Sequence, residues 1–491
     1  MRRKILFVVN LLIPLFAVLI PVLAAGKSIA DVVPVWGDET WWWQQANAIS
    51  AFGRPLGYWG YNGVTAPYGT FAAWGAAPAF PYGLFAAAFG WKYGSFVYAN
   101  LFYQTLAIGL FLVLTKPDGK SLALLTLINA TQAIRNAYLV VCMQESVRSA
   151  FALVAAGLLI WLYRRMEEDT KAVGAVKALT GLFLFVIGQL YLMWTGFFFP
   201  YFLILHRKLK PAARLAAAAA ETGCLMLASQ KLLGLTSSPY YKQAVGLFKG
   251  ILSNMRGYYY ILRTADVAWF FKWYHGGLTL LAAVLAVYLL VRWRSMEKED
   301  RILLISALTV YAAFLGGHIV LYNTTLWTFT RGMAMGILVF SFVTAAMKKK
   351  VPACAVAVWG AVCLLLFCTG HVDATFFNDD RFRSEAWEAR IAETKDMTSE
   401  MEDALRGERS HDPWTYTVAT YAVSSDPVTL SLPKGFSENA MIDGEIRTEA
   451  AWIAIGKDTD PEKAEEYRAA FLKEGYLVSG ESDTLLILHR K

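Results

Sequence analysis

Long apolar runs separated by short polar connections occupy the first three quarters of the chain. Each run is close to the ~20 residues that a helix needs to cross the hydrocarbon of a bilayer. The first runs from Ile5 to about Ala25, and 173–205 is long enough for two crossings because glycines and Pro200 interrupt it. The others lie at 94–115, 121–142, 146–163, 211–229, 275–292, 302–321, 329–347 and 351–370. The pattern predicts about eleven transmembrane helices.

Two apolar stretches leave an alternative open. The first run could be a cleavable signal peptide, because Ala24-Ala25-Gly26 is similar to a cleavage site, but its core is longer than the ~7–15 residues of a signal core. The stretch from Pro78 to Trp91 is short and rich in Pro and Gly, so we expect it to lie at the interface instead of crossing.

The last quarter of the chain has a different pattern. An amphipathic, charged stretch from Asp380 to Arg406 predicts a helix, and Pro461 to Lys473 predicts another. Short β-prone runs predict strands at Tyr416–Ala422, Val428–Leu432, Ala451–Ile455 and Leu485–His489. We therefore expect a small α/β domain at 371–491 after a transmembrane domain at 1–370.

Charge gives this arrangement an orientation. Residues 1–370 carry a net charge of +19, and residues 371–491 carry −11. Alternate connections concentrate the cations, with 20 Lys and Arg in the 44 residues of 1–4, 116–120, 164–177, 207–214, 292–301 and 348–350. Cationic loops stay on the cytoplasmic side, so the N-terminus is expected inside. The loops 26–93 and 230–274 and the C-terminal domain are then extracytoplasmic, on a plasma (inner) membrane protein.

Composition limits the function classes. Hydrophobic residues make up 56% of the 491 and charged residues only 17%, which is far from a soluble balance. The net charge of +8 therefore reflects membrane topology, and no nucleic-acid partner is expected. All five cysteines fall in apolar runs, which excludes a disulfide framework in the C-terminal domain.

The stretch from Val35 to Gly60 carries the strongest chemical signal. It contains adjacent carboxylates, Asp38 and Glu39, among five tryptophans. Trp favours the boundary between water and lipid, so we expect a short interfacial helix that presents an acidic pair. Asp38 could instead serve only as the N-cap of a helix that begins at Glu39.

Ionisable residues inside apolar runs are a second signal, because they are costly in a membrane. Arg135 lies in the run 121–142, Glu221 in 211–229, and Glu145 near the outer end of 146–163. They could line a polar cavity. The alternative is that Arg135 and Glu221 pair with each other or with backbone and hold the bundle together.

Cations on the outer side form a third signal. The loop 230–274 interleaves basic and aromatic residues, among them Lys231, Arg256 and Arg263. His318 and Arg331 flank the outer turn between two late spans. Cations outside run against the expected bias, so an anion should hold them there. Lipid head groups are one candidate, and a bound phosphate or diphosphate is the other.

The layout resembles the GT-C glycosyltransferases, which include the protein O-mannosyltransferases and the aminoarabinose transferases. The resemblance rests on G-D-E at Gly37–Glu39, the interrupted hairpin at 173–205, the basic-aromatic outer loop and R-G-M-A-M-G from Arg331. It covers residues 1–370. The stretch T-A-P-Y-G-T-F-A-A-W-G-A-A-P departs from the family pattern, and the C-terminal domain has no family-wide counterpart.

The resemblance implies an inverting transferase that uses a polyprenyl-phosphate-linked sugar and a lipid, glycan or protein acceptor. A carboxylate such as Asp38, with Glu39 beside it, can remove the acceptor proton as general base. Arg331, His318, Lys231, Arg256 and Arg263 would bind the donor phosphate. Cations can absorb the charge of the leaving phosphate, so neither metal nor cofactor is expected. The alternatives are a polymerase or ligase that uses diphosphate-linked glycans, and a transporter or flippase of lipid-linked sugars.

Overall fold

The computed structural model describes residues 2–35, 37–53, 55, 75–236, 255, 269–321, 326–366, 368–369, 379–399, 418–421, 452–457 and 460–490. For residues 37–38, 41, 52, 236, 269–275, 314, 317–321, 326–335, 379 and 418–421 it describes the backbone alone.

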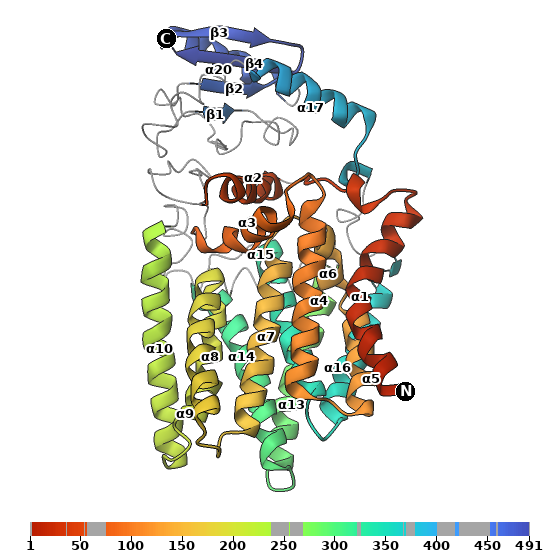
Figure 1. Ribbon diagram of the computed structural model, residues 1–491, viewed down its shortest axis with the longest axis vertical. Helices are drawn as coiled ribbons and strands as arrows, with labels where there is room; N and C mark the ends of the chain where they lie inside the picture. Colours follow the sequence, from red (N-terminus) through yellow and green to blue (C-terminus); the bar gives the residue numbers. More distant parts are fainter. Residues whose placement is uncertain are drawn as a thin grey trace.

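Helices packed side by side along the long axis form most of the molecule (Figure 1). They are α1 (Arg2–Ala24), α4 (Ser95–Thr115), α5 (Gly119–Thr131), α6 (Ala133–Ala137), α7 (Glu145–Arg164), α8 (Lys171–Leu190), α9 (Phe198–Leu205), α10 (Pro211–Thr236), α13 (Trp269–Arg292), α14 (Lys298–Leu321), α15 (Leu326–Ala345) and α16 (Val351–Leu366). A helix is present at each predicted span. Two short helices, α2 (Gly37–Phe52) and α3 (Phe80–Phe89), lie across the end that we call the upper end, as in Figure 1.

The outer surface of the bundle is apolar, as a lipid environment requires. Large side chains such as Ile20, Leu179 and Leu290 are 67%, 64% and 72% exposed. Within the described residues, α1, α4, α7 and α8 are long and apolar enough to cross a membrane as single helices. The chain is a polytopic α-helical membrane protein.

Helix α1 is an integral part of this bundle. Asn10 in its middle is fully buried, and its Nδ2 donates to Thr126 Oγ1 at 2.8 Å. The carbonyl of Asn10 accepts from Asn129 Nδ2 at 3.0 Å. These polar contacts tie α1 to α5 in the protein interior. Removal of the segment as a signal peptide would expose them.

The expected span 121–142 is not one helix. It is α5, then α6 after a break at Gln132 (φ −77°, ψ 72°), then a 3₁₀ turn, η3 (Tyr138–Val140). Side chains satisfy backbone acceptors that the break leaves free at the end of α5. Arg135 Nη2 donates to the carbonyl of Asn129 at 2.7 Å, and Asn136 Nδ2 donates to that of Ala130 at 3.1 Å. Hydrogen-bonded carbonyls make such a break tolerable at membrane depth.

The C-terminal domain contains a four-stranded sheet in the order β1-β2-β4-β3. The strands are β1 (Val418–Tyr421), β2 (Trp452–Gly456), β3 (Tyr476–Glu481) and β4 (Leu485–Arg490), with β1 parallel to β2 and the other pairs antiparallel. Helix α20 (Pro461–Lys473) packs on the sheet, and its bounds are those expected from the sequence. Strand β3 was not expected, and Val428–Leu432 lies outside the described residues.

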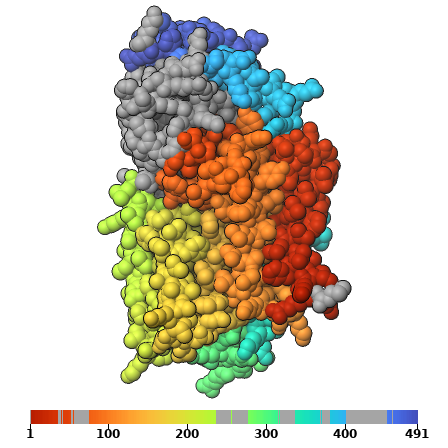
Figure 2. Space-filling view, viewed as in Figure 1, coloured from red at the N-terminus to blue at the C-terminus, as the bar shows by residue number. Residues whose placement is uncertain are grey.

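The junction into this domain differs from the prediction. A 3₁₀ turn, η7 (Asp379–Arg381), comes first, and Ser384 then caps α17 (Glu385–Met397) with its Oγ accepting from Trp387 N at 3.1 Å. The helix expected from Asp380 therefore begins later, because Arg381 and Phe382 have other partners. Figure 2 shows the C-terminal domain on the upper end of the bundle, next to the segments that carry α2 and α3.

Candidate active site

The first turn of α2 brings the acidic pair to the upper end of the bundle. The helix begins at Gly37, one residue before Asp38, so Asp38 lies inside the helix and not at the N-cap. Glu39 is the first residue of α2 whose side chain the structure describes, and it is fully buried. An isolated buried carboxylate is very costly, so its partners decide what the residue does.

Three segments meet at the Glu39 carboxylate. Arg381 Nη1 donates to both oxygens at 2.7 Å, and the side chains of both residues are 0% exposed. The backbone N–H of Cys142 donates to Oε2, also at 2.7 Å. The carboxylate thereby joins α2 to the C-terminal domain and to the chain that follows η3.

Backbone pairing supports this contact. Val32 and Phe382 form an antiparallel β-bridge. Val33 N donates to the carbonyl of Arg381 at 3.0 Å, and Arg383 N donates to that of Asp31 at 2.8 Å. The segment before α2 is thus held directly against the start of the C-terminal domain. The Asp31 carboxylate accepts hydrogen bonds from the side chain and backbone of Ser28, which lowers its pKa.

An aromatic cluster holds α2 at Trp43, one turn after Glu39 on the same face of the helix. Trp43 Nε1 donates to the carbonyl of Lys92 at 3.1 Å, and Trp91 Nε1 donates to that of Trp43 at 3.0 Å. Trp43 stacks on Tyr93 with ring centroids 5.2 Å apart, and Tyr93 meets Trp387 of α17 edge-on at 4.9 Å. The rings therefore link α2, the chain before α4 and α17.

Polar side chains of α4 fix the segment that supplies the Cys142 N–H. Asn100 Nδ2 donates to the carbonyls of Leu139 at 3.1 Å and Val141 at 3.0 Å. Gln104 Nε2 donates to the carbonyl of Ser146 at 2.6 Å. Both side chains are fully buried. The irregular backbone below α2 is therefore held by the bundle.

Next to this segment lie polar atoms without a hydrogen bond within the described part of the chain. Gln144 is 2% exposed, and neither polar atom of its side chain is paired. Glu145, the first residue of α7, has a buried, unpaired Oε2. Buried polar atoms are rarely left unpaired, so this corner suits a polar ligand. Arg148, one turn further along α7, has its guanidinium 5.0 Å from the Tyr191 ring centroid.

The two charges expected inside the bundle do not pair with each other. Arg135 is 3% exposed, and its Nη2 also contacts Asn129 Oδ1, so its partners belong to α5. Glu221 lies 2.9 Å from His206 Nε2 through either oxygen and is partly exposed. The alternative that joined Arg135 to Glu221 is therefore wrong, although backbone pairing of Arg135 is confirmed.

The structure describes the side chains of only some of the expected phosphate-binding residues. Lys231 is exposed near the upper end of α10. His318 lies near the end of α14 and Arg331 near the start of α15, and both are described by their backbone alone. Arg256 and Arg263 lie outside the described residues. The described residues contain no group of three His, Cys, Asp or Glu side chains able to hold a metal ion.

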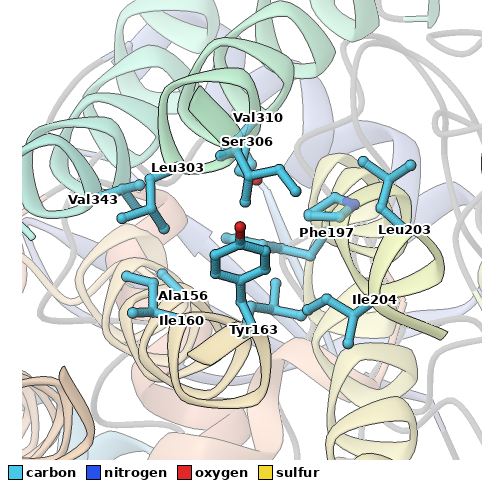
Figure 3. Close-up of a pocket in the computed structure, with 13 residues that line it drawn as sticks. Ala156, Ile160, Tyr163, Phe197, Leu203, Ile204, Leu303, Ser306, Val310 and Val343 are labelled. Atoms are coloured by element: carbon cyan, nitrogen blue, oxygen red, sulfur yellow. The ribbon is translucent and has the colours of Figure 1, made fainter. Parts of the chain in front are cut away.

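A cavity lies at the opposite, lower end. Figure 3 shows the ring of Tyr163 directed into it, with Ser306 on the facing side. Except for these two hydroxyls its lining is apolar: Ala156, Leu159, Ile160, Phe197, Pro200, Leu203, Ile204, Ile302, Leu303, Val310 and Val343. It offers no charged group for a phosphate and does not belong to the candidate site.

Sequence reasoning missed Arg381, whose guanidinium pairs with the Glu39 carboxylate. It lies 342 positions away in the chain, in a charged stretch that reads as a solvated helix. The only signal was that Arg381 and Arg383 are basic residues at the start of an otherwise acidic domain.

No protein-family model matches this chain, and no curated protein matches it significantly. Solved structures match its fold. The oligosaccharyltransferase AglB from Archaeoglobus fulgidus, in complex with an inhibitory peptide and a dolichol-phosphate, gives a TM-score of 0.53 at 11% identity, covering 98% of this chain and 74% of that chain. The apo form of the A. fulgidus oligosaccharyltransferase gives 0.50 at 11% identity, covering 89% and 64%. This chain thus spans less than two thirds of that enzyme's length.

ArnT from Cupriavidus metallidurans, bound to undecaprenyl phosphate, gives a TM-score of 0.49 at 11% identity, covering 98% of this chain and 97% of that chain. Identities this low compare folds alone. The oligosaccharyltransferases share with this chain the architecture described above.

Proposed function

We propose that this chain, which has the fold of the GT-C glycosyltransferases, moves a sugar from a polyprenyl-phosphate donor to a lipid, glycan or protein acceptor. The observation that carries the proposal is the anchoring of the acidic helix α2 at the upper end of the bundle, with Glu39 fixed by Arg381 and Cys142. The dolichol-phosphate bound to the archaeal oligosaccharyltransferase supports a polyprenyl-phosphate ligand.

Asp38 is the proposed general base. It precedes Glu39 in the first turn of α2, so the contacts that fix Glu39 also limit the movement of Asp38. The carboxylate removes the proton of the acceptor hydroxyl while the oxygen attacks the anomeric carbon. Attack opposite the leaving phosphate inverts the configuration at that carbon. Glu39, whose oxygens are occupied by Arg381 and Cys142, supports this base instead of replacing it.

Cations near the upper ends of the later helices are proposed to bind the donor phosphate. Lys231 belongs to the last turns of α10, and His318 and Arg331 belong to the connected ends of α14 and α15. Fixed cations stabilise the negative charge that the phosphate gains as the sugar leaves, without a proton transfer to it. Gln144 and Glu145 are candidates for contacts with sugar hydroxyls, because their buried polar atoms lack partners.

The reaction is proposed to occur at the outer face of the membrane. The lower-end connections carry most of the cations, which favours a cytoplasmic lower end. They are also joined by ion pairs, such as Arg164 with Glu299 at 2.8 Å and Arg207 with Asp169 at 2.6 Å. The upper end, with α2 and the domain 371–491, is then extracytoplasmic.

A second candidate is the transfer of an oligosaccharide from a diphosphate-linked carrier. The fold comparison supports an oligosaccharide as the transferred group, because two of the matching structures are oligosaccharyltransferases. The two candidates differ in the donor, so a donor panel separates them.

The test uses the purified full chain in lipid nanodiscs with a panel of sugars linked to polyprenyl monophosphate and diphosphate. Release of the lipid leaving group, a monophosphate from one donor class and a diphosphate from the other, is measured with and without a membrane extract as the source of acceptor. We expect turnover of a monophosphate donor. Asp38→Asn should lower it about 10²–10⁴-fold, which is the usual contribution of general-base catalysis. Glu385→Gln, an exposed carboxylate in the first turn of α17, is the matched control and should be unaffected.

Turnover of diphosphate donors alone would favour the second candidate. A folded chain that releases neither lipid monophosphate nor lipid diphosphate from these donors, with or without extract, would contradict both.

A further inference from the structure

We propose that Arg381 is a positioning residue for the site on α2, so that docking of the C-terminal domain fixes the acidic helix in its working position. The catalytic consequence rests on the proposed function, whereas the effect on α2 itself does not. Arg381 would touch neither substrate nor reacting atoms. It would act through Glu39, the neighbour of the proposed base.

The first argument is the connectivity of the Glu39 carboxylate. It receives hydrogen bonds from Arg381 in the C-terminal domain and from Cys142 in the bundle. Each bond is 2.7 Å long, and together they restrain the carboxylate from two directions. Glu39 and Asp38 are consecutive in one helical turn, so a rotation of α2 that moves one residue moves the other.

The second argument is burial. The side chains of Glu39 and Arg381 are both 0% exposed, so water cannot substitute for a lost partner. A buried ion pair is a weak source of net stability, since apolar residues of similar volume often pack as well. What it supplies beyond apolar packing is a directional contact that only one arrangement satisfies. Here that contact joins segments 342 residues apart.

The third argument is that the backbone at Arg381 is paired with the segment before α2. Its carbonyl accepts from Val33 N, and the next residue, Phe382, pairs with Val32 in the β-bridge. Val32, Val33 and Phe382 are at most 5% exposed. The guanidinium thus projects from a fixed backbone, as positioning requires.

The test compares Arg381→Gln with Arg383→Gln. Gln ends two bonds short of a guanidinium and cannot reach Glu39 from the same backbone. Arg383 is the matched control, because its guanidinium lies 5.5 Å from the Tyr93 ring centroid and 5.9 Å from that of Trp387, and the loss of such contacts costs less than the loss of one partner of a buried ion pair. Hydrogen exchange is measured on the full chain in nanodiscs. Arg381→Gln should speed exchange of the α2 amides about 100-fold or more, and Arg383→Gln should leave it unchanged.

The double variant Glu39→Gln/Arg381→Gln separates positioning from stability. It leaves no unpaired buried charge, so thermal stability should return toward that of the parent protein. If Arg381 positions α2, amide exchange stays fast and kcat for the donor stays about 10²-fold low, while KM for the donor changes little. If the double variant recovers slow exchange and a normal kcat together with its stability, the proposal is overturned. Unchanged exchange in Arg381→Gln would also overturn it. Absence of donor turnover in the parent protein would count against the proposed function only, because exchange still decides the role of Arg381.

Discussion

The contact between α2 and α3 provides a direct test of how tightly the acidic helix is held from the membrane side. Gly83 of α3 faces Ile49 of α2. A Cβ added at position 83 would lie 2.4 Å from Ile49 Cβ and Cγ2 and 2.7 Å from Cδ1. Non-bonded carbons normally approach to about 4 Å, so Gly83→Ala must push the two helices apart by about 1 Å or more. Ile49 is 4% exposed and cannot rotate away.

The magnitude follows from two opposing effects. Overpacking a buried contact costs about 1–3 kcal/mol. Ala is favoured over Gly inside a helix by up to about 1 kcal/mol, which offsets part of that cost. We expect Gly83→Ala to destabilise the protein by up to about 2 kcal/mol. A shift of about 1 Å at α2 should also lower donor turnover by up to about 10²-fold.

The assay is thermal unfolding in nanodiscs, with Gly174→Ala as the matched control. Gly174 is an exposed residue of α8, and a Cβ there meets nothing within 4 Å, so that variant should be neutral or slightly stabilised. Adding Ile49→Ala to Gly83→Ala should not restore stability, because Ile49 Cβ remains at 2.4 Å. If Gly83→Ala unfolds at the same temperature as Gly174→Ala, the packing argument is refuted.

Three further predictions concern charge and topology. Arg331→Ala should weaken binding of a polyprenyl phosphate by about 1.5–3 kcal/mol, the worth of a charged hydrogen bond, and unchanged affinity in a stable variant would remove Arg331 from the site. Ser410→Cys should react with a membrane-impermeant thiol reagent in intact cells, whereas labelling only after permeabilisation would reverse the proposed orientation. The folded-state pKa of Asp31 is lowered mainly by Ser28, so its stabilising contribution is present at neutral pH and is lost as pH falls through that pKa. Ser28→Ala should raise the pKa and move this loss to higher pH, and acid-unfolding curves that coincide for the two proteins would contradict it.

The sequence was sufficient for the elements that depend on local pattern. Apolar run length located the bundle helices, and Pro461 with its amphipathic continuation located α20. These elements are buried in lipid or against one sheet, and such burial requires a run or a regular spacing of apolar residues that can be recognised in the sequence. That α2 and α3 lie across the end of the bundle could also be predicted, because a Trp-rich or Pro/Gly-rich stretch is too short or too polar to cross.

Prediction failed where distant residues or local side-chain competition decide the backbone. At the break at Gln132, Arg135 and Asn136 bond to carbonyls that a continuous helix would have used, and hydropathy does not register such bonds. Strand β3 is an edge strand with mixed exposure, so it lacks the alternation that marks a half-buried strand. The acidic pair could be found from local residues, whereas Arg381 could not.

The separation of Glu39 from Arg381 has a consequence for the synthesis of this protein. At ~5–20 residues per second, the 342 residues between them take on the order of 20–70 s to translate. During that interval all of the described membrane helices after α1 are made while the Glu39 carboxylate still lacks Arg381. The Glu39 carboxylate must therefore stay exposed to water, where a charge costs little, and can be buried against Arg381 only after residue 381 has been synthesised. Chains that terminate after α16 would keep an exposed acidic helix, a feature by which quality control could distinguish unfinished molecules from finished ones.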